Sequence, residues 1–142
     1  MNRFSTTTDI LYNDNTKKDI FIAHISDLHF NSNTTTKMLN KLKDYIFNIN
    51  PDYIMITGDL IDTPSITNDK DKIKELVTFL SGLGKKAKVL ISIGNHDVFT
   101  SESFNFFEKL DDLYNIYVLD NKSYQDEFIF VTINEGNCIP LL

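Results

Sequence analysis

The sequence predicts an α/β fold built on a parallel β-sheet. Short apolar segments alternate along the chain with longer segments in which apolar residues recur every three or four positions, and this order is typical of βαβ units. The first three short segments are apolar along their length rather than alternating, as expected for strands buried on both faces. Each of the three is followed directly by polar residues, so the predicted fold also indicates where a ligand would bind.

Five short apolar segments are predicted as strands, at residues 20–25, 53–57, 88–93, 116–119 and 128–133. With the helices, they give the order βαβαβα followed by ββ. Residues 1–18 are polar and irregular and are expected to form an N-terminal arm, so the domain itself spans residues 19–142. The final residues, NEGNCIPLL, predict neither a helix nor a clear terminus.

Three segments are predicted as helices, at residues 34–49, 69–83 and, as a short helix, 104–110. In the first helix, apolar residues recur on one face and Pro51 follows the end. The residues of this face are Met38, Leu39, Leu42, Tyr45, Ile46 and Ile49. Right-handed crossovers place the first two helices on one face of the sheet. The strands are apolar on both faces, so the opposite face needs a cover of its own.

Composition narrows the class of protein. The chain has 142 residues, of which 42% are hydrophobic, as expected for one globular domain. Its formal net charge of −6 argues against a non-specific nucleic-acid binder. Cys138 is the only cysteine, so no disulfide forms within the chain. No segment approaches the ~20 apolar residues of a membrane span, and no signal peptide is recognisable, so a cytoplasmic protein without membrane contact is expected.

Polar clusters follow the first three predicted strands, and they read SDLH, GDLID and GNHD. The carboxyl ends of parallel strands meet at one edge of a sheet, so these clusters should lie together. Any one of them alone could be an ordinary turn stabilised by an Asx hydrogen bond. Three at successive strand ends favour a site, whose expected members are Asp27, His29, Asp59, Asn95 and His96.

Carboxylate, imidazole and amide groups together suit divalent Mn, Fe, Zn or Co. Asp27 and His29, two positions apart, can turn toward one ion, and Asp59 has two oxygens with which to bridge two ions. Asn95 offers a neutral oxygen to the second ion. Two ions about 3.5–4 Å apart can activate water and bind a phosphoryl oxygen. His96 could then stabilise charge or donate a proton to the leaving oxygen.

Three further polar residues lie near these clusters. Asp97 follows His96 and could orient its ring. Asp62 could support the metal ligands from behind or cap a helix. His24 lies inside the first strand on the face of Ile22, and is expected to be an inner, hydrogen-bonded histidine next to the site rather than a metal ligand.

The segments HISDLHF, GDLID and GNHD, in that order, resemble the first three motifs of the calcineurin-like metallophosphoesterases. The resemblance runs from about residue 20 to residue 133. It implies the first βαβαβ half of a four-layer α/β/β/α sandwich, truncated, and the hydrolysis of phosphomonoesters or phosphodiesters by two divalent metal ions. It makes Asp27 and His29 ligands of the first ion and Asp59 the bridge. It makes Asn95 a ligand of the second ion and His96 the catalytic histidine.

The sequence departs from the family pattern after these motifs. No histidine follows His96, whereas the family has three more histidine ligands there. The chain is therefore expected to be an incomplete enzyme that needs a C-terminal half or a second chain. By itself it should hydrolyse little, and it should associate through its uncovered sheet face. The alternative is a non-catalytic metal-binding or complementing protein of the same fold.

The same motifs bear on the substrate. GDLIDTP and GNHD differ from the GDxVDRG and GNHE segments that are typical of the protein Ser/Thr phosphatases in this family. A small-molecule or nucleotide phosphoester is therefore a more plausible substrate than a phosphoprotein, and the acidic composition argues mildly against DNA.

Overall fold

The computed structural model describes residues 5–12, 18–97, 100–134 and 137–141. Its larger sheet has four parallel strands in the order β1-β2-β3-β4. These strands are β1 (Ile22–Ser26), β2 (Tyr53–Thr57), β3 (Lys88–Ser92) and β4 (Ile116–Leu119). The predicted parallel α/β fold is confirmed, and sequential strands are neighbours throughout the sheet.

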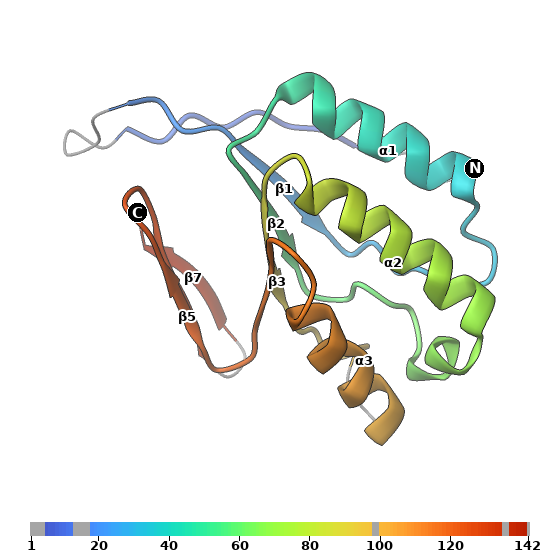
Figure 1. Cartoon of the computed structure of the whole chain (residues 1–142). Coiled ribbons are helices and arrows are strands. Elements are labelled where there is room, and N and C mark those ends of the chain that lie inside the picture. Colours follow the sequence, from blue (N-terminus) through green and yellow to red (C-terminus); the bar gives the residue numbers. More distant parts are fainter. Residues whose placement is uncertain (1–4, 13–17, 98–99, 135–136, 142) are drawn as a thin grey trace.

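Three helices cover one face of this sheet (Figure 1). They are α1 (Thr36–Ile49), α2 (Lys70–Gly84) and α3 (Ser101–Asp111). A short 3₁₀ helix, η1 (Pro64–Asn68), precedes α2 and was not predicted. Beneath the helices, Ile54, Ile56 and Ile91 of the sheet are fully buried and belong to one large apolar core.

The helix starts differ slightly from the predicted ones because polar side chains cap them. The Thr35 hydroxyl accepts a hydrogen bond from the Met38 N–H at 3.2 Å, so α1 begins at residue 36 rather than 34. The Asp69 carboxylate accepts one from the Lys72 N–H at 3.1 Å, so Asp69 lies just outside α2. These caps satisfy N–H groups that have no partner within the helix.

A second sheet lies on the opposite face of the first (Figure 1). It is antiparallel, with the order β5-β6-β7. Its strands are β5 (Ser123–Gln125), β6 (Phe130–Asn134) and β7 (Asn137–Leu141). The final residues were expected to form no helix, and they form none among those described; β7, which pairs with β6, was not predicted. The predicted strand at 128–133 begins two residues later, at Phe130.

The second sheet corrects one expectation about the first. The second face of the larger sheet was expected to be covered by another segment or chain. Instead, Ile129 and Val131 of this chain are buried against Tyr53, Leu90 and Leu119 of that sheet. The chain therefore supplies part of the cover itself, mostly over β2 to β4. The expectation that the chain associates through the remaining face stays a prediction.

A polar cluster joins the two sheets beside this apolar contact. The Asp126 carboxylate accepts hydrogen bonds from the Tyr53 hydroxyl at 2.6 Å, the Tyr124 hydroxyl at 2.9 Å and the Lys88 ammonium at 3.0 Å. The same carboxylate accepts the N–H groups of Phe128 and Ile129. One acidic side chain thus ties the start of the second sheet to β2 and β3.

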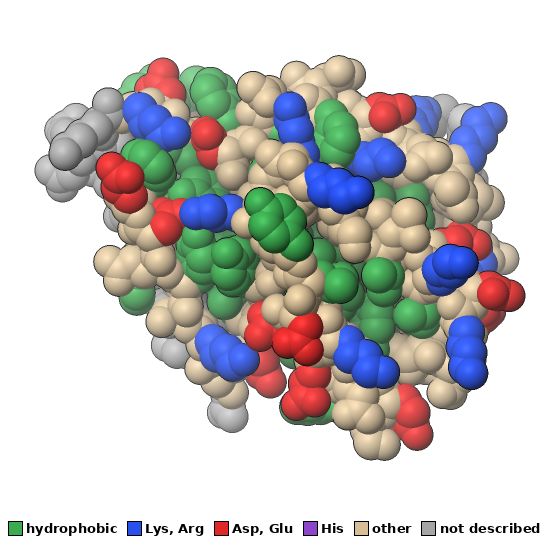
Figure 2. Space-filling model, viewed as in Figure 1, with side chains coloured by type: hydrophobic (Ala, Val, Ile, Leu, Met, Phe, Trp, Pro, Cys, Tyr) green, Lys and Arg blue, Asp and Glu red, His purple; other side chains and the backbone are tan. Residues whose placement is uncertain are grey.

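The molecular surface carries charges of both signs. Figure 2 shows acidic and basic side chains interspersed over the face turned to the viewer, with apolar side chains exposed between them. Basic groups are scattered on this face rather than gathered into a patch of the kind that binds a phosphate backbone. Among the helices that the structure describes, none combines the length and apolar character needed to cross a bilayer.

Candidate metal centre

The three polar clusters emerge from neighbouring strands at the same edge of the parallel sheet. Ser26, Thr57 and Ser92, the last residues of β1, β2 and β3, are aligned with one another across the sheet. The loops that follow them carry, in turn, Asp27 and His29, then Asp59 and Asp62, then Asn95 to Asp97. In-register strand ends therefore bring these residues together from widely separated parts of the chain.

The backbone at this edge adopts left-handed conformations that are unusual for residues with side chains. Asp27, His29 and Asp59 have φ angles of 52°, 47° and 48°. Such residues are strained, and they persist only where the surrounding structure fixes them. Here the His29 N–H donates to the Asp59 carbonyl at 2.9 Å, and the Phe30 N–H donates to the Leu60 carbonyl at 2.9 Å. The β1 and β2 loops thus hold each other in place.

The first group of candidate ligands comprises Asp27, His29 and Asp59. The Nε2 atom of His29 lies 3.8 Å from Asp27 Oδ1 and 3.8 Å from Asp59 Oδ2. One donor atom from each residue lies within 4.8 Å of the other two. Two carboxylates and an imidazole fit a divalent transition ion in chemical type, and the strained backbone holds them together.

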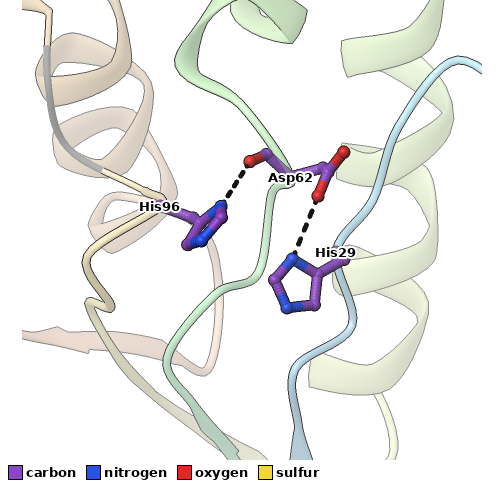
Figure 3. Close-up of side chains that lie close together, drawn as sticks. All are labelled: His29, Asp62 and His96. Carbon is purple, nitrogen blue, oxygen red and sulfur yellow. Dashed lines mark hydrogen bonds and ion pairs between the residues drawn. The ribbon is translucent and has the colours of Figure 1, made fainter.

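The other ring nitrogen of His29 faces a carboxylate. Its Nδ1 atom lies 3.1 Å from Asp62 Oδ1, and a dashed line marks this contact in Figure 3. This is the usual arrangement of a metal-binding imidazole, whose second nitrogen donates to an acceptor that fixes the ring. Asp62 does not cap a helix, because Thr63 occupies the N-cap position of η1.

His96 is held by the same loop. Its Nδ1 atom lies 2.8 Å from the backbone carbonyl of Asp62 (Figure 3). A carbonyl only accepts, so Nδ1 carries the hydrogen and Nε2 is left for other partners. The His96 N–H donates to Asp59 Oδ1 at 3.0 Å. The hydrogen bond to the Asp62 carbonyl raises the pKa of His96, as do the nearby carboxylates, although partial burial opposes the change.

Asp97 has different partners from the one predicted. Its carboxylate is fully buried and accepts hydrogen bonds from the Ile61 N–H at 2.9 Å and the Gly94 N–H at 2.7 Å. Burial raises its pKa, and these hydrogen bonds only partly offset that effect. The Asp62 carbonyl, not Asp97, accepts the hydrogen bond from the His96 ring. Asp97 instead joins the β2 loop to the β3 loop from inside.

His24 also differs from its expected surroundings. It is exposed rather than buried, since β1 is an edge strand and the second sheet covers mainly β2 to β4. It is hydrogen-bonded, as expected, with its Nε2 atom 2.6 Å from Thr57 Oγ1. Asn95 is exposed in the loop after β3, next to His96.

Two contributors to this geometry were missed from the sequence. Gly94 was considered only as a turn residue, yet a Cβ at this position would overlap the backbone nitrogen and carboxylate of Asp59. The backbone carbonyl of Asp62, which accepts the hydrogen bond from His96, could not be predicted, because every residue has such a carbonyl. A glycine directly before Asn95 and His96 was the one available signal for the close approach.

Comparisons with known proteins identify a family for this sequence. Residues 21–140 match the family model described as calcineurin-like phosphoesterase. An uncharacterized metallophosphoesterase of Campylobacter jejuni is 33% identical over 85 residues, which is 60% of this chain and 21% of the relative. The UDP-2,3-diacylglucosamine pyrophosphatases of Chlamydia muridarum and Chlamydia trachomatis are each 30% identical over 89 residues, 63% of this chain and 26% of the relatives.

The chain spans about a fifth to a quarter of the length of these relatives, 21% of the first and 26% of the others. The family match, by contrast, covers most of the chain and includes all three strand-end clusters. The chain therefore belongs to the calcineurin-like phosphoesterase family.

Proposed function

We propose that this chain carries the N-terminal half of a two-metal centre that hydrolyses phosphomonoesters or phosphodiesters. Family membership supports phosphoester hydrolysis as the reaction class. The observation that carries the proposal is the convergence of Asp27, His29 and Asp59, whose donor atoms lie within 4.8 Å of one another. Divalent ions bound there would polarise the phosphoester and lower the pKa of the attacking water.

Each ligand has a proposed place. Asp27 and His29 would hold the first ion, and Asp59 would be a ligand shared by the two ions. Asn95 offers its amide oxygen to the second ion. The mixture of carboxylate, imidazole and amide groups suits Mn, Fe, Zn or Co. Further ligands of the second ion would come from another segment of the whole protein or from a second chain.

His96 is the proposed proton donor. Its Nδ1 hydrogen bond to the Asp62 carbonyl, at 2.8 Å, supports a fixed ring orientation with Nε2 available to substrate. When the ring is protonated, Nε2–H can donate to the leaving oxygen. The raised pKa of His96, due first to that carbonyl, favours the protonated form before turnover. Asp62 orients His29, and Asp97 positions the two loops that carry Asp59 and His96.

The substrate is proposed to be a small phosphoester, with a nucleotide-linked compound as the first choice. Two relatives are named as pyrophosphatases of UDP-2,3-diacylglucosamine, which is a nucleotide diphosphate compound. These names support a substrate of that kind. The net charge of −6 disfavours a long polyanion such as DNA.

Calorimetric titration with Mn²⁺ tests the proposed bridge. Asp62→Ala removes a residue that only orients a ligand, and such a loss usually lowers metal affinity about 10–100-fold. Asp59→Ala removes a ligand itself, so it should lower Mn²⁺ affinity further. Asp44→Ala, at an exposed position on α1, is the control and should bind as wild type does. Equal losses in Asp59→Ala and Asp62→Ala would remove the bridging role.

Turnover tests the role of His96. In a preparation that hydrolyses bis-p-nitrophenyl phosphate with Mn²⁺, His96→Ala should lower turnover by roughly 10²–10⁴-fold. Mn²⁺ affinity should barely change. The 142-residue chain alone should hydrolyse this substrate weakly or not at all, and robust turnover by it would show that the described ligands suffice.

A further inference from the structure

We propose that His29, Asp62 and His96 form an alternative position for a single Zn²⁺-like ion, and that occupation of this position inhibits the phosphoesterase. The three residues lie on the three strand-end loops, and one donor atom from each lies within 4.8 Å of the other two. The inhibitory part of the proposal rests on the proposed function, whereas the binding part stands on the geometry alone.

The arrangement of these side chains carries the inference. Figure 3 shows Asp62 between the two imidazole rings, with its carboxylate toward His29 and its backbone carbonyl toward His96. His29 Nδ1 and Asp62 Oδ1 are 3.1 Å apart, close to the roughly 3.3 Å that separates two ligands of a tetrahedral zinc ion. The two rings meet edge to face, with centroids 5.1 Å apart and an interplanar angle of 87°.

The donor set differs in kind from the first group. It offers two imidazole nitrogens and one carboxylate oxygen, a combination that suits Zn, Fe or Cu better than Mn, which prefers oxygen ligands. The group of Asp27, His29 and Asp59 offers one nitrogen and two carboxylates. A nitrogen-preferring ion should therefore favour the alternative position, and Mn²⁺ should favour the first group. The His29 and Asp62 side chains are 35% and 43% exposed, so an added ion can reach them from solvent.

The two positions share His29, and this makes them exclusive. A neutral imidazole has one nitrogen with a free lone pair and one that carries hydrogen. His29 Nε2 faces Asp27 and Asp59, whereas His29 Nδ1 faces Asp62. An ion bound through Nε2 leaves Nδ1–H to donate to Asp62, and an ion bound through Nδ1 requires the opposite tautomer. The ring therefore serves one ion at a time.

Occupation of the alternative position also uses His96, the proposed proton donor. Zinc bound there would remove a ligand from the first ion and the acid from the reaction in one step. The centre would thus distinguish an activating metal such as Mn²⁺ from an inhibiting one such as Zn²⁺ by the ligands that each prefers.

Zinc K-edge X-ray absorption on the 142-residue chain, with one equivalent of Zn²⁺, tests the binding. The count of imidazole ligands should be two in the wild type and one in His96→Asn. His96→Asn should also lower Zn²⁺ affinity by tenfold or more while leaving Mn²⁺ affinity unchanged. His24→Asn, which removes an exposed histidine outside both groups, is the matched control and should change neither value.

The outcomes separate this inference from the proposed function. One imidazole per zinc in the wild type, no zinc binding, or an unchanged zinc affinity in His96→Asn would overturn the alternative position. The proposed function would still stand if Asp59→Ala loses Mn²⁺. Conversely, two imidazoles per zinc with no effect of Asp59→Ala on Mn²⁺ would support the alternative position and sink the bridging role.

Discussion

Gly94 packs directly against Asp59, so that no side chain can be placed at position 94 without meeting the Asp59 backbone nitrogen and carboxylate. Gly58 lies at the same contact, and a Cβ there would sit 3.4 Å from the Gly94 Cα. The β2 and β3 loops therefore touch through two glycines at the proposed bridging carboxylate. The position of that carboxylate depends on residues that have no side-chain chemistry of their own.

Gly94→Ala should displace Asp59, because the three atoms that the new methyl would meet are the backbone nitrogen of Asp59 and the Oδ1 and Cγ atoms of its bridging carboxylate. We expect Mn²⁺ affinity to fall at least tenfold in calorimetric titration. Gly82→Ala is the control, since its nearest neighbour is the flexible Lys43 side chain at 3.5 Å and it lies within helix α2. That variant should be as stable as wild type or gain up to about 1 kcal/mol. Wild-type Mn²⁺ binding by Gly94→Ala would show that this packing does not position the ligand.

Asp97→Asn should destabilise the fold rather than act on chemistry alone. An amide can accept from only one side, so one of the Ile61 and Gly94 N–H groups would face a donor in a fully buried site. An unsatisfied buried donor costs roughly 1–3 kcal/mol, measurable as a shift of the urea unfolding midpoint. Asp62→Asn, at a partly exposed site, should cost less. Unchanged stability with impaired turnover would instead support the catalytic role predicted from the sequence.

Much of the fold was predictable because the spacing of apolar residues differs between strands and helices. The site was predictable because the carboxyl ends of parallel strands lie at one edge of the sheet. The predicted bounds of β2 and β4 match the structure, since each is a short apolar run between clear breaks. The grouping of the three polar clusters followed from the same reasoning. His29 and Asp59 could be predicted as neighbours from the sequence, because each follows the end of a strand and the ends of β1 and β2 are in register.

The second sheet was harder to predict because its strands are short and owe their conformation to partners. β5 has only three residues, and β7 includes Pro140, which removes a backbone donor. A proline is tolerated there because β7 is at the edge of the sheet order β5-β6-β7. The inward direction of Asp97 was equally invisible, since it depends on how two loops approach each other.

Ile129→Ala tests whether the second sheet is part of the stable core. Ile129 is 3% exposed and packs with Tyr53, Leu90 and Leu119, so truncation should cost about 2–4 kcal/mol in urea unfolding. Phe130, the next residue, is 38% exposed, and Phe130→Ala should cost clearly less. Similar losses in the two variants would mean that the second sheet does not pack on β2 to β4 in solution.

Asp126→Asn should show a pH-dependent loss of stability. Burial alone would raise the pKa of Asp126, but hydrogen bonds from Tyr53, the Phe128 N–H and Lys88 outweigh it and hold the pKa well below its usual range. A carboxylate whose pKa is lowered by folding stabilises the protein above its unfolded pKa of about 3.9, and this stabilisation is lost as the pH falls toward the folded value. At pH 7 the variant should therefore be about 2 kcal/mol less stable than wild type, the usual worth of hydrogen bonds to a charged group.

The difference between wild type and Asp126→Asn should narrow below about pH 4, because the carboxyl group of the unfolded wild type then takes up a proton that the folded form, with its lower pKa, does not. Urea unfolding at pH 7 and at successive values from pH 4 downward measures the gap directly. Asp120→Asn, at an exposed site just after β4, is the control and should match wild type at every pH. A gap for Asp126→Asn that stays constant into the acid range would show that its charge does not join the two sheets. The hydrogen bonds from Tyr53 and Lys88 would then contribute by geometry alone.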